Sequence, residues 1–262
     1  MALAIATNNG ALQAAAAASS VNRSMETSME RLSTGMRINS ASDDAAGVAI
    51  SSRLSAEIRG TNQSIRNALD GQSLIDTAEG AHKEVENLLQ RMRELAIQAA
   101  NGTNDADDIT NLEAEFTALS TEITRIGEVT SFAGKALTGT DATAFSFQVG
   151  SGTATANQIS VTINSIKSAS IGTDSGTQLS AVVTAGLDDL TETNAAIVVI
   201  DDAIKEVNTQ RSELGAVSNR LNHTVNNLTN ISSNLSSAQG RIQDADFALE
   251  TTKLAKNQIL QQ

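Results

Sequence analysis

The amino-acid sequence predicts a mainly α-helical protein, in which long antiparallel coiled-coil-like helices form an elongated rod with a small β-hairpin region. Two long segments, 43–100 and 191–242, support this fold class because the chain contains no proline to interrupt them. Aliphatic residues in both segments recur at alternating steps of four and three residues, as in coiled coils. Strict alternation of apolar and polar residues, typical of strands, occurs in a short stretch between them.

Composition excludes several classes of function. The 262-residue chain has a net charge of −12, which argues against nucleic-acid binding because phosphate contacts need clustered Lys and Arg. It has no cysteine and therefore no disulfide. No stretch approaches the roughly 20 apolar residues of a membrane span, so we expect no membrane insertion. Residues 1–22 lack the positive region that precedes the apolar run of a Sec signal peptide. Any export would use another route.

The first long helix is expected over residues 43–100. Ser40 and Asp43 have the spacing of a capping box, and Asp43 and Asp44 would place negative charge in the first helical turn. The helix should end at Asn101-Gly102, a favoured stop. At about 1.5 Å per residue such a helix would be roughly 85 Å long. The rest of the chain must therefore supply partners for it.

A stripe of regularly spaced residues runs along each long helix. The stripe of the first helix is Ala78, His82, Val85, Leu89, Met92, Ala96 and Ala99. The stripe of the second, 191–242, is Ile200, Ile204, Val207, Arg211, Leu214, Ser218, Leu221, Val225, Leu228, Ser232, Leu235, Gln239 and Ile242. We expect the two stripes to pack together in a seam, the rod seam, whose main apolar residues are Val85, Leu89, Met92, Leu214, Leu221, Val225, Leu228 and Leu235. His82 is then a packed core histidine rather than a metal ligand.

Arg91 and Leu95 lie one helical turn apart but off the first stripe. A single exposed leucine is common on protein surfaces and needs no explanation. Alternatively, the pair is half of an inter-subunit or receptor patch. Both interpretations expect Leu95 to be exposed rather than part of the core.

The stretch between the long helices should hold a shorter helix and a hairpin. The helix is expected over 104–127, with Asp107 and Asp108 near its start, where the helix dipole favours negative charge. The hairpin belongs to a β-hairpin region at 131–190, and its alternating residues are Phe145, Phe147 and Val149, then Ile159, Val161 and Ile163. The thickest core is expected where hairpin and helices meet. Ser165 to Gly186, rich in Ser, Thr and Gly, is expected to be a surface connection.

No motif of enzymatic chemistry stands out. The chain has neither a Walker-type phosphate loop nor a GxGxxG motif. Its two histidines, His82 and His223, have no partner at metal-ligand spacing. A Ser-His-Asp site cannot be judged from sequence order, since such triads assemble in space, but no nucleophile-elbow motif supports one. We therefore expect no enzyme, no metal and no cofactor.

The two ends carry thin apolar stripes. Residues 1–33 and 247–262 contain little aromatic area, so neither can offset an ordering cost of roughly 1–2 kcal/mol per residue by itself. One interpretation is a frayed terminus. The other, which we favour, is that both ends are mobile in the monomer and fold when many subunits bring them together around a channel.

Long stretches of the sequence resemble bacterial flagellin. The motifs that carry the resemblance are SMERLSTGMRINSA (28–41) followed by DDAAG (43–47), LQRMRELAIQAANG (89–102), QRSELGAVSNR (210–220) and RIQDADF (241–247). The resemblance covers roughly residues 1–135 and 190–262. It implies a short flagellin without outer domains, since Ser165 to Leu190 is too short to hold one. It also implies a structural subunit that polymerises into the flagellar filament for motility.

The resemblance implies a domain plan and a set of partners. Residues 1–42 would form the amino-terminal part of the inner-tube helical domain with its connector, and 43–242 the rod domain. Residues 243–262 would form the carboxy-terminal part, incomplete because the family's last helix continues past Gln262. Implied partners are other copies in a helical homopolymer, an export chaperone, the filament cap and the hook-junction proteins. The implied location is extracellular, after unfolded export through the flagellar type III channel without cleavage.

Arg91, Leu95 and Glu115 match positions through which some flagellins engage the vertebrate Toll-like receptor for flagellin. The same positions line packing surfaces between neighbouring subunits in the family. Two alternative functions remain open. The hook–filament junction protein shares the terminal signatures, although the unbroken match in the Arg91–Asn101 block favours flagellin. A coiled-coil signalling protein would also show four–three stripes, but it should carry an anchoring segment.

Overall fold

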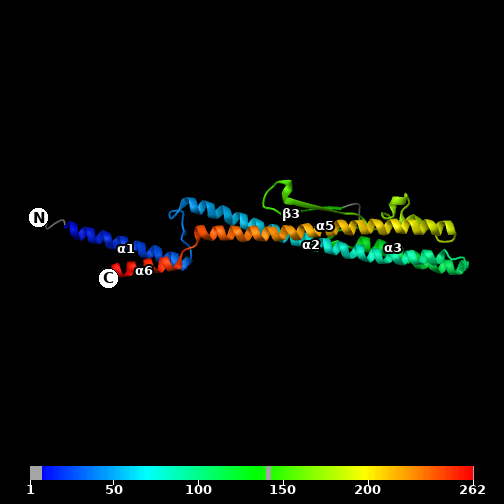
Figure 1. Cartoon of the computed structure of the whole chain (residues 1–262), viewed down its shortest axis with the longest axis horizontal. Helices are drawn as coiled ribbons and strands as arrows, with labels where there is room; N and C mark the ends of the chain where they lie inside the picture. Colours follow the sequence, from blue (N-terminus) through cyan, green and yellow to red (C-terminus); the bar gives the residue numbers. More distant parts are fainter. Residues whose placement is uncertain (1–7, 140–142, 262) are drawn as a thin grey trace. The chain divides into compact units, whose positions relative to one another are not determined.

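The structure is a computed structural model that describes residues 8–139 and 143–261 (Figure 1). Residues 1–7 of the expected amino-terminal helix lie outside the described residues. The elements in chain order are α1 (Asn9–Thr34), α2 (Ala45–Ala99), α3 (Ala106–Val129), β1 (Ser131–Phe132), β2 (Lys135–Ala136), β3 (Thr143–Gln148), β4 (Gln158–Ile163), α4 (Leu179–Ala185), α5 (Leu190–Gln243) and α6 (Phe247–Gln261). Short 3-10 turns occur at Thr155–Asn157 and Thr173–Ser175. The predicted mainly α-helical fold with a small hairpin is confirmed.

The chain divides into two compact units. The terminal unit contains Met1–Asn62 and Thr229–Gln262, and the central unit contains Gln63–Leu228. Both boundaries fall inside a long helix, α2 in one case and α5 in the other. The domain plan that the resemblance implies has its boundaries in the connectors, near residues 42 and 243. Each unit thus contains a part of both long helices.

In the terminal unit, α1 and α6 pack side by side (Figure 1). The side chain of Asn8 caps α1 by accepting hydrogen bonds from the N–H groups of Gly10 and Ala11. The helix ends at Gly35, whose left-handed backbone (φ 72°) suits glycine. The connectors that follow α1 and α5 are tied together, because the Arg37 N–H donates to the Gln243 carbonyl at 2.7 Å.

The start of α2 differs from the predicted capping box. Asp43 lies before the helix, and its carboxylate accepts hydrogen bonds from the backbone N–H groups of Asn39 and Ser40, at 3.1 and 2.9 Å. These backbone bonds lower the pKa of Asp43. Asp44 is the residue that caps α2, since its Oδ1 accepts from the Gly47 N–H at 2.8 Å. The two adjacent aspartates therefore have different roles: Asp43 stabilises the turn before α2, and Asp44 caps the helix. Their spacing in the sequence had predicted that both would lie in the first turn of the helix.

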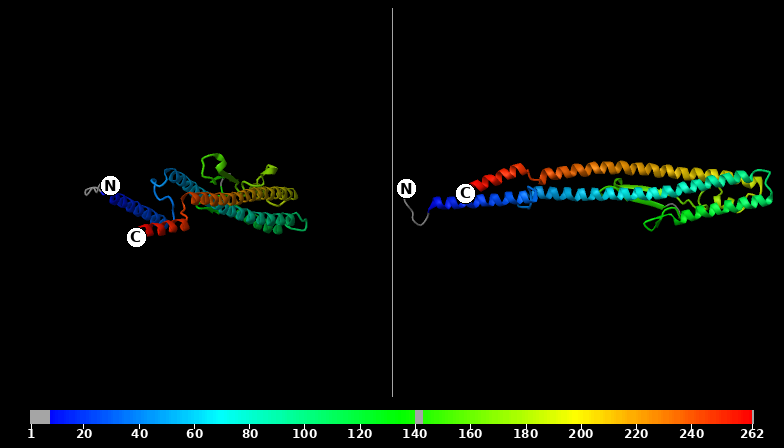
Figure 2. Two further views of the ribbon diagram at one scale, coloured as in Figure 1. Left: turned by 60° about the vertical axis from the view of Figure 1, so that its left-hand side comes forward. Right: turned by 90° about the horizontal axis from the view of Figure 1, so that it is seen from below.

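In the central unit, α3 and parts of α2 and α5 pack together along their lengths (Figure 2). Asp105 and Asp108 form a capping box at the start of α3, close to the predicted start. Strands β3 and β4 pair antiparallel, with Phe145 opposite Val161 and Phe147 opposite Ile159, which confirms the predicted hairpin.

A second, smaller hairpin joins β1 to β2, and the sequence did not suggest it. Its turn residues, Ala133 and Gly134, both have positive φ (49° and 80°). Two left-handed residues in a row are typical of a type I′ hairpin turn. An Ala-Gly pair is not a strong turn signal, so this element left little trace in the sequence pattern.

Two apolar cores fill the central unit. The larger core joins α3 and α4 to the carboxy-terminal half of α2 and the amino-terminal part of α5, and it includes Phe116 and Met92. The smaller core joins β3 and β4 to α2 and α5. The expectation that the thickest core lies at the hairpin is therefore wrong. The phenylalanines of the hairpin, Phe145 and Phe147, are only half-buried.

The segment from Ser165 to Gly186 is not the predicted surface connection. Its scattered apolar residues are buried in the larger core: Ile166, Ile171, Leu179 and Val182. They are spaced irregularly among Ser, Thr and Gly, so neither a helical nor a strand period marks them. Because the segment is mostly polar in composition, its contribution to the larger core could not be predicted from the sequence.

Candidate interface surfaces

The rod-seam residues lie inside the subunit. Val85, Leu89, Met92, Leu214 and Leu221 are fully buried, and Leu228 is 8% exposed. Val225 and Leu235 are half-buried. The buried side chains of the central unit are therefore occupied by packing within the subunit and are not free to bind another molecule, whereas Leu235 belongs to the terminal unit.

His82 is a fully buried core histidine, as the stripe predicted. Its Nδ1 lies 2.7 Å from the Ala78 carbonyl oxygen of the preceding turn. Burial lowers the pKa of this imidazole below its usual value, because a charged ring would lose its hydration. Among the described residues, no group of three or more His, Cys, Asp or Glu side chains is arranged to hold a metal ion.

The three residues Arg91, Leu95 and Glu115 do not form one surface. Arg91 and Glu115 are exposed, and their side chains form an ion pair, with Arg91 Nε 2.9 Å from Glu115 Oε1. Arg91 Nη1 also pairs with Glu94 at 3.0 Å. Leu95, in contrast, is 1% exposed and belongs to the larger core. The surface that remains is charged, and we term Arg91, Glu94 and Glu115 the α2–α3 patch.

The expectation that Leu95 is exposed is therefore wrong, for a geometric reason. A helix in a two-helix coiled coil buries one stripe, but α2 shares its core with both α3 and α5. A second face must then be apolar, and Leu88 and Leu95, seven residues apart, lie on it. The four–three count identified only the face toward one partner.

The terminal unit exposes much of its apolar surface. Among its described residues, Ile38 is the one large aliphatic side chain that is buried. The large apolar side chains that it exposes are Leu12, Met29, Ile50, Ile231, Phe247, Leu249, Ile259 and Leu260, with exposed fractions from 37% to 74%. Exposed apolar area on this scale commonly marks a surface that another protein covers.

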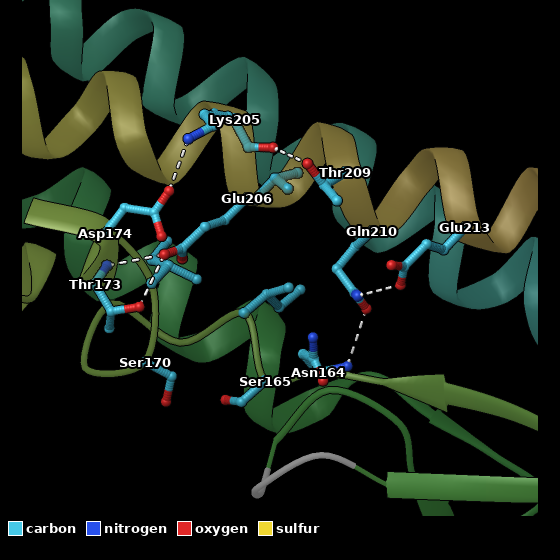
Figure 3. A pocket seen from close by; sticks show the side chains of 13 residues that line it. Asn164, Ser165, Ser170, Thr173, Asp174, Lys205, Glu206, Thr209, Gln210 and Glu213 are labelled. Atoms are coloured by element: carbon cyan, nitrogen blue, oxygen red, sulfur yellow. Dashed lines mark hydrogen bonds and ion pairs between the residues drawn. The ribbon is translucent and has the colours of Figure 1, made fainter.

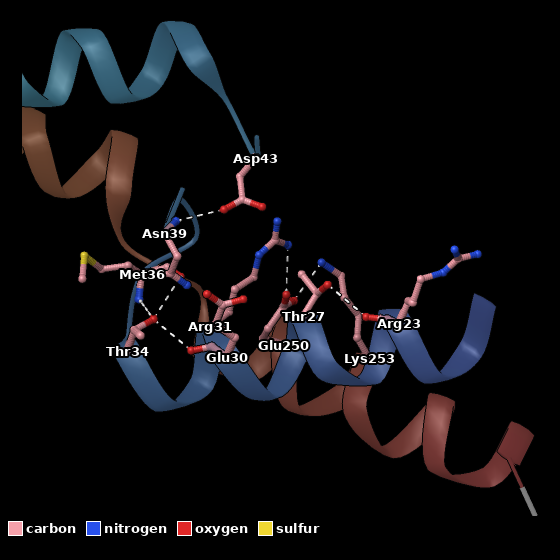
Figure 4. A network of polar contacts seen from close by, with 10 residues as sticks. All are labelled: Arg23, Thr27, Glu30, Arg31, Thr34, Met36, Asn39, Asp43, Glu250 and Lys253. Atoms are coloured by element: carbon pink, nitrogen blue, oxygen red, sulfur yellow. Dashed lines mark hydrogen bonds and ion pairs between the residues drawn. The ribbon is translucent and has the colours of Figure 1, made fainter. Parts of the chain in front are cut away.

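A polar network links α1 and α6 in the terminal unit (Figure 4). Glu250 is buried, and it pairs with Arg31 at 3.1 Å and with Lys253 at 2.8 Å. Burial alone would raise the pKa of Glu250, but the hydrogen bonds and charges of Lys253 and Arg31 outweigh it, and the pKa is lowered. The contact between these two helices is therefore polar where the end of α1 meets the start of α6.

A hollow of about 550 Å³ lies between α5 and the loop after β4 (Figure 3). The loop is fastened to α5 across it, because the Glu206 carboxylate accepts hydrogen bonds from the N–H groups of Gly172 and Thr173, each at 2.9 Å. Lys205 also pairs with Asp174 at 2.8 Å. These contacts hold the buried part of the 165–186 segment in place.

The fold defines a class of proteins built from long packed helices with a small β-hairpin. None of the described helices combines the length and hydropathy that crossing a membrane requires. The model of the bacterial flagellin N-terminal helical region matches residues 5–142, and that of the C-terminal helical region matches residues 197–262.

Relatives of known identity agree with these two matches. Flagellin of Halalkalibacterium halodurans is 44% identical over 89% of this chain and 83% of its own length. Polar flagellin F of Vibrio parahaemolyticus is 35% identical over 100% of this chain and 94% of its own length. That match runs over 356 residues, against 262 here, so this Vibrio flagellin contains segments that have no counterpart in this sequence. A solved structure described as a flagellar hook-associated protein from Vibrio parahaemolyticus shares the fold, with a TM-score of 0.66 and 17% identity over 77% of this chain and 100% of its own.

The chain belongs to the bacterial flagellin family. Flagellins are structural proteins that polymerise with themselves, and the chain is therefore a subunit of the flagellar filament.

Proposed function

We propose that this subunit is exported unfolded through the flagellar type III channel, without a cleaved signal peptide, and assembles outside the cell through its terminal unit. The observation that carries the proposal is a contrast among the described residues of that unit: one large aliphatic side chain, Ile38, is buried, and eight large apolar side chains are exposed. A unit with so little buried apolar area gains most from covering its surface with neighbouring copies.

The proposed domain plan follows the same contrast. Residues 1–42 and 243–262 form the inner tube, where apolar helices of many copies meet, and 43–242 form the surrounding rod. Absence of cysteine suits passage as an unfolded chain, since no disulfide has to be opened first. The proposed partners during export and assembly are an export chaperone, the filament cap and the hook-junction proteins. No catalytic role is part of the proposal.

Assembly through the terminal unit can be tested with a matched pair of exposed residues. Leu249 on α6 and Val198 on α5 are both 54% exposed, one in each unit. Leu249→Ser should abolish or strongly shorten filaments, because it removes apolar area that neighbouring copies bury. Val198→Ser should leave filaments and motility largely intact. Cells lacking other flagellins would express each variant, and sheared filaments and swimming would be measured.

Monomer melting temperatures would serve as the control, since both side chains are exposed and neither variant should lower them. Normal filaments with Leu249→Ser would contradict assembly through α6. Retention of the unassembled variant inside the cell would instead place the defect in export.

The α2–α3 patch supports a second proposal, that Arg91 and Glu115 contact a neighbouring subunit or the Toll-like receptor for flagellin. Both side chains are exposed and held in one geometry by their ion pair. Arg91→Glu should therefore weaken filament packing or receptor signalling without changing the melting temperature of the monomer. Arg125→Glu is a matched control, because Arg125 is also exposed and paired, with Glu122 on α3. If Arg91→Glu and Arg125→Glu had equal effects, the cause would be the change in net charge, and the proposed contact at Arg91 would be contradicted.

A further inference from the structure

A layer of polar side chains interrupts the apolar seam of the central unit. Glu79, His82 and Glu86 follow each other on α2 at steps of three and four residues, so they share one face of the helix. Arg211 of α5 reaches both carboxylates, pairing with Glu86 through Nη1 and lying 3.7 Å from Glu79 through Nη2. The guanidinium therefore bridges the helical turn that carries the imidazole.

The hydrogen bonds of His82 identify which ring nitrogen holds the proton. A carbonyl oxygen can only accept, so the contact of Nδ1 with the Ala78 carbonyl at 2.7 Å requires a proton on Nδ1. In the neutral ring, Nε2 is then a bare acceptor, and this buried atom has no hydrogen-bond partner. The buried Nε of Arg211 has none either. A second proton on the imidazole would thus enter a buried site that offers Nε2–H no acceptor.

The charges around the imidazole oppose that second proton on balance. Burial is the largest effect and lowers the pKa of His82, and the positive charge of Arg211 lowers it further. The hydrogen bond to the Ala78 carbonyl and the charge of Glu79 act in the opposite direction, but the pKa still lies below its usual value. Glu86 is already paired with Arg211. Strands β3 and β4, which share the smaller core with Ala78, contain no ionisable residue. These two strands therefore supply no charge that could compensate a charged ring.

We propose that the His82–Arg211 layer is a proton-sensitive lock on the rod seam: α2 and α5 stay packed there while the imidazole is neutral, and the seam opens locally when the ring takes up a proton. The direction follows from linkage. A group whose pKa is lower in the folded state stabilises the fold fully above its unfolded-state pKa, about 6.5 for histidine. Below that pH the unfolding equilibrium shifts about tenfold per pH unit, until the folded-state pKa is reached. Mild acid, short of carboxylate titration, is the trigger.

The full chain carries its own internal control, because its only other histidine, His223, is exposed. Nitrogen-15 NMR of the two imidazoles between pH 8 and 5 distinguishes the tautomer and the charge of each ring. His223 supplies the reference signal of an exposed ring. His82 should remain neutral with the proton on Nδ1, and gain charge only in molecules whose seam has opened. A His82 ring that takes up its proton near pH 6.5 in the closed, folded state would overturn the proposal.

Two variants measure the thermodynamic consequence. The thermal unfolding equilibrium of His223→Gln should show the same pH dependence as the unaltered chain from pH 7.5 to 5.5. His82→Gln should lack about one decade of that dependence per pH unit, because glutamine does not titrate. An unchanged slope in His82→Gln would refute the lock.

Peptide-resolved amide exchange, corrected for the intrinsic pH effect, tests whether the opening is local. It should increase around residues 78–89 and 207–218 before it does in α3. Uniform loosening of the central unit would contradict a lock at this layer. If His82→Gln does not fold, the NMR titration and the exchange of the unaltered chain still decide the outcome.

Discussion

The two units of this subunit differ in core and in charge. The central unit contains both apolar cores, whereas Ile38 is the one large aliphatic residue buried in the described part of the terminal unit. Residues 63–228 hold 10 Lys and Arg against 22 Asp and Glu, while the rest of the chain holds 8 of each. The whole net charge of −12 therefore belongs to the central unit.

This difference teaches that one chain can separate folding from assembly. The central unit is stabilised by its own packing, and we expect its negative charge to oppose the close approach of other copies. The terminal unit has no net charge and exposes eight large apolar side chains among its described residues, so we expect neighbouring copies to approach it without electrostatic repulsion. Folding of the subunit should then depend mainly on the central unit, and polymerisation mainly on the terminal unit.

The largest expected contrast between the units is in amide exchange. Central segments of α2, α3 and α5 should open only with free energies of about 5 kcal/mol or more, close to global unfolding. Helices α1 and α6 should open with about 1 kcal/mol or less in a dilute monomer, because few apolar contacts hold them. Hydrogen–deuterium exchange of monomers and filaments would measure this, with protection of both ends appearing only in filaments. Strong protection of α1 in the dilute monomer would show that the terminal unit folds without neighbours.

The stripe of α5 offers a graded test, because it continues through both units. Leu221 is fully buried, Leu228 is 8% exposed, and Leu235 in the terminal unit is half-buried. Leu221→Asp should destabilise the monomer by roughly 3–5 kcal/mol, since it buries an unpaired charge. Leu228→Asp should cost somewhat less, and Leu235→Asp about 1 kcal/mol or less. Chemical denaturation would rank the three, and equal losses would mean that the terminal unit has a core of its own.

The same stripe shows what the sequence could and could not predict. Four–three periodicity identified both long helices and the faces that meet, because helical spacing depends only on local backbone geometry. Depth of burial depends on how many other elements cover a position. The periodic pattern is the same around Leu221 and Leu235, although only Leu221 is fully buried. Periodicity therefore predicted contact but not its energetic weight.

Leu95 shows the consequence for a candidate site. The resemblance to flagellin grouped it with Arg91 and Glu115, and its place off the stripe suggested exposure. The structure buries it, because α3 covers a second face of α2. Whether a second helix covers that face depends on tertiary packing, which a local sequence pattern does not predict. The prediction of a surface connection at 165–186 was wrong for a related reason. The buried residues of this segment are irregularly spaced, so they form no periodic pattern that would indicate a contact with the core.

A substitution at Leu95 sharpens the contrast between buried and exposed parts of the central unit. Leu95→Ala should destabilise the monomer by about 2–4 kcal/mol, as cavity-forming changes do in a packed core. Ile97→Ala, two residues further along α2 and 49% exposed, is the matched control and should change the melting temperature little. Thermal melts of both would measure this, and near wild-type stability of Leu95→Ala would restore the earlier view that this side chain lies at an interface.

The smallest expected effect concerns the polar contact between α1 and α6. Glu250 has a lowered pKa in the folded state, because Lys253 and Arg31 outweigh the effect of burial. Its contribution is therefore complete above its unfolded-state pKa, about 4.3, and is lost as the pH falls through the folded-state pKa. The population of paired α1 and α6 should decrease below about pH 4 in the unaltered chain.

Glu250→Gln removes this titration while keeping the shape of the side chain. It should lower the helix population of α6 at pH 7 by the equivalent of about 1 kcal/mol and make it insensitive to acid in this range. Glu26→Gln, an exposed residue on α1, is the control and should leave both properties unchanged. Carbon-13 chemical shifts of α6 between pH 7 and 3 report the helix population directly. If Glu250→Gln retains the acid response, another carboxylate governs the pairing. If Glu250→Gln also leaves the helix population at pH 7 unchanged, apolar contacts alone hold α1 and α6 together. The terminal unit would then resemble the central unit, which is stabilised by apolar packing.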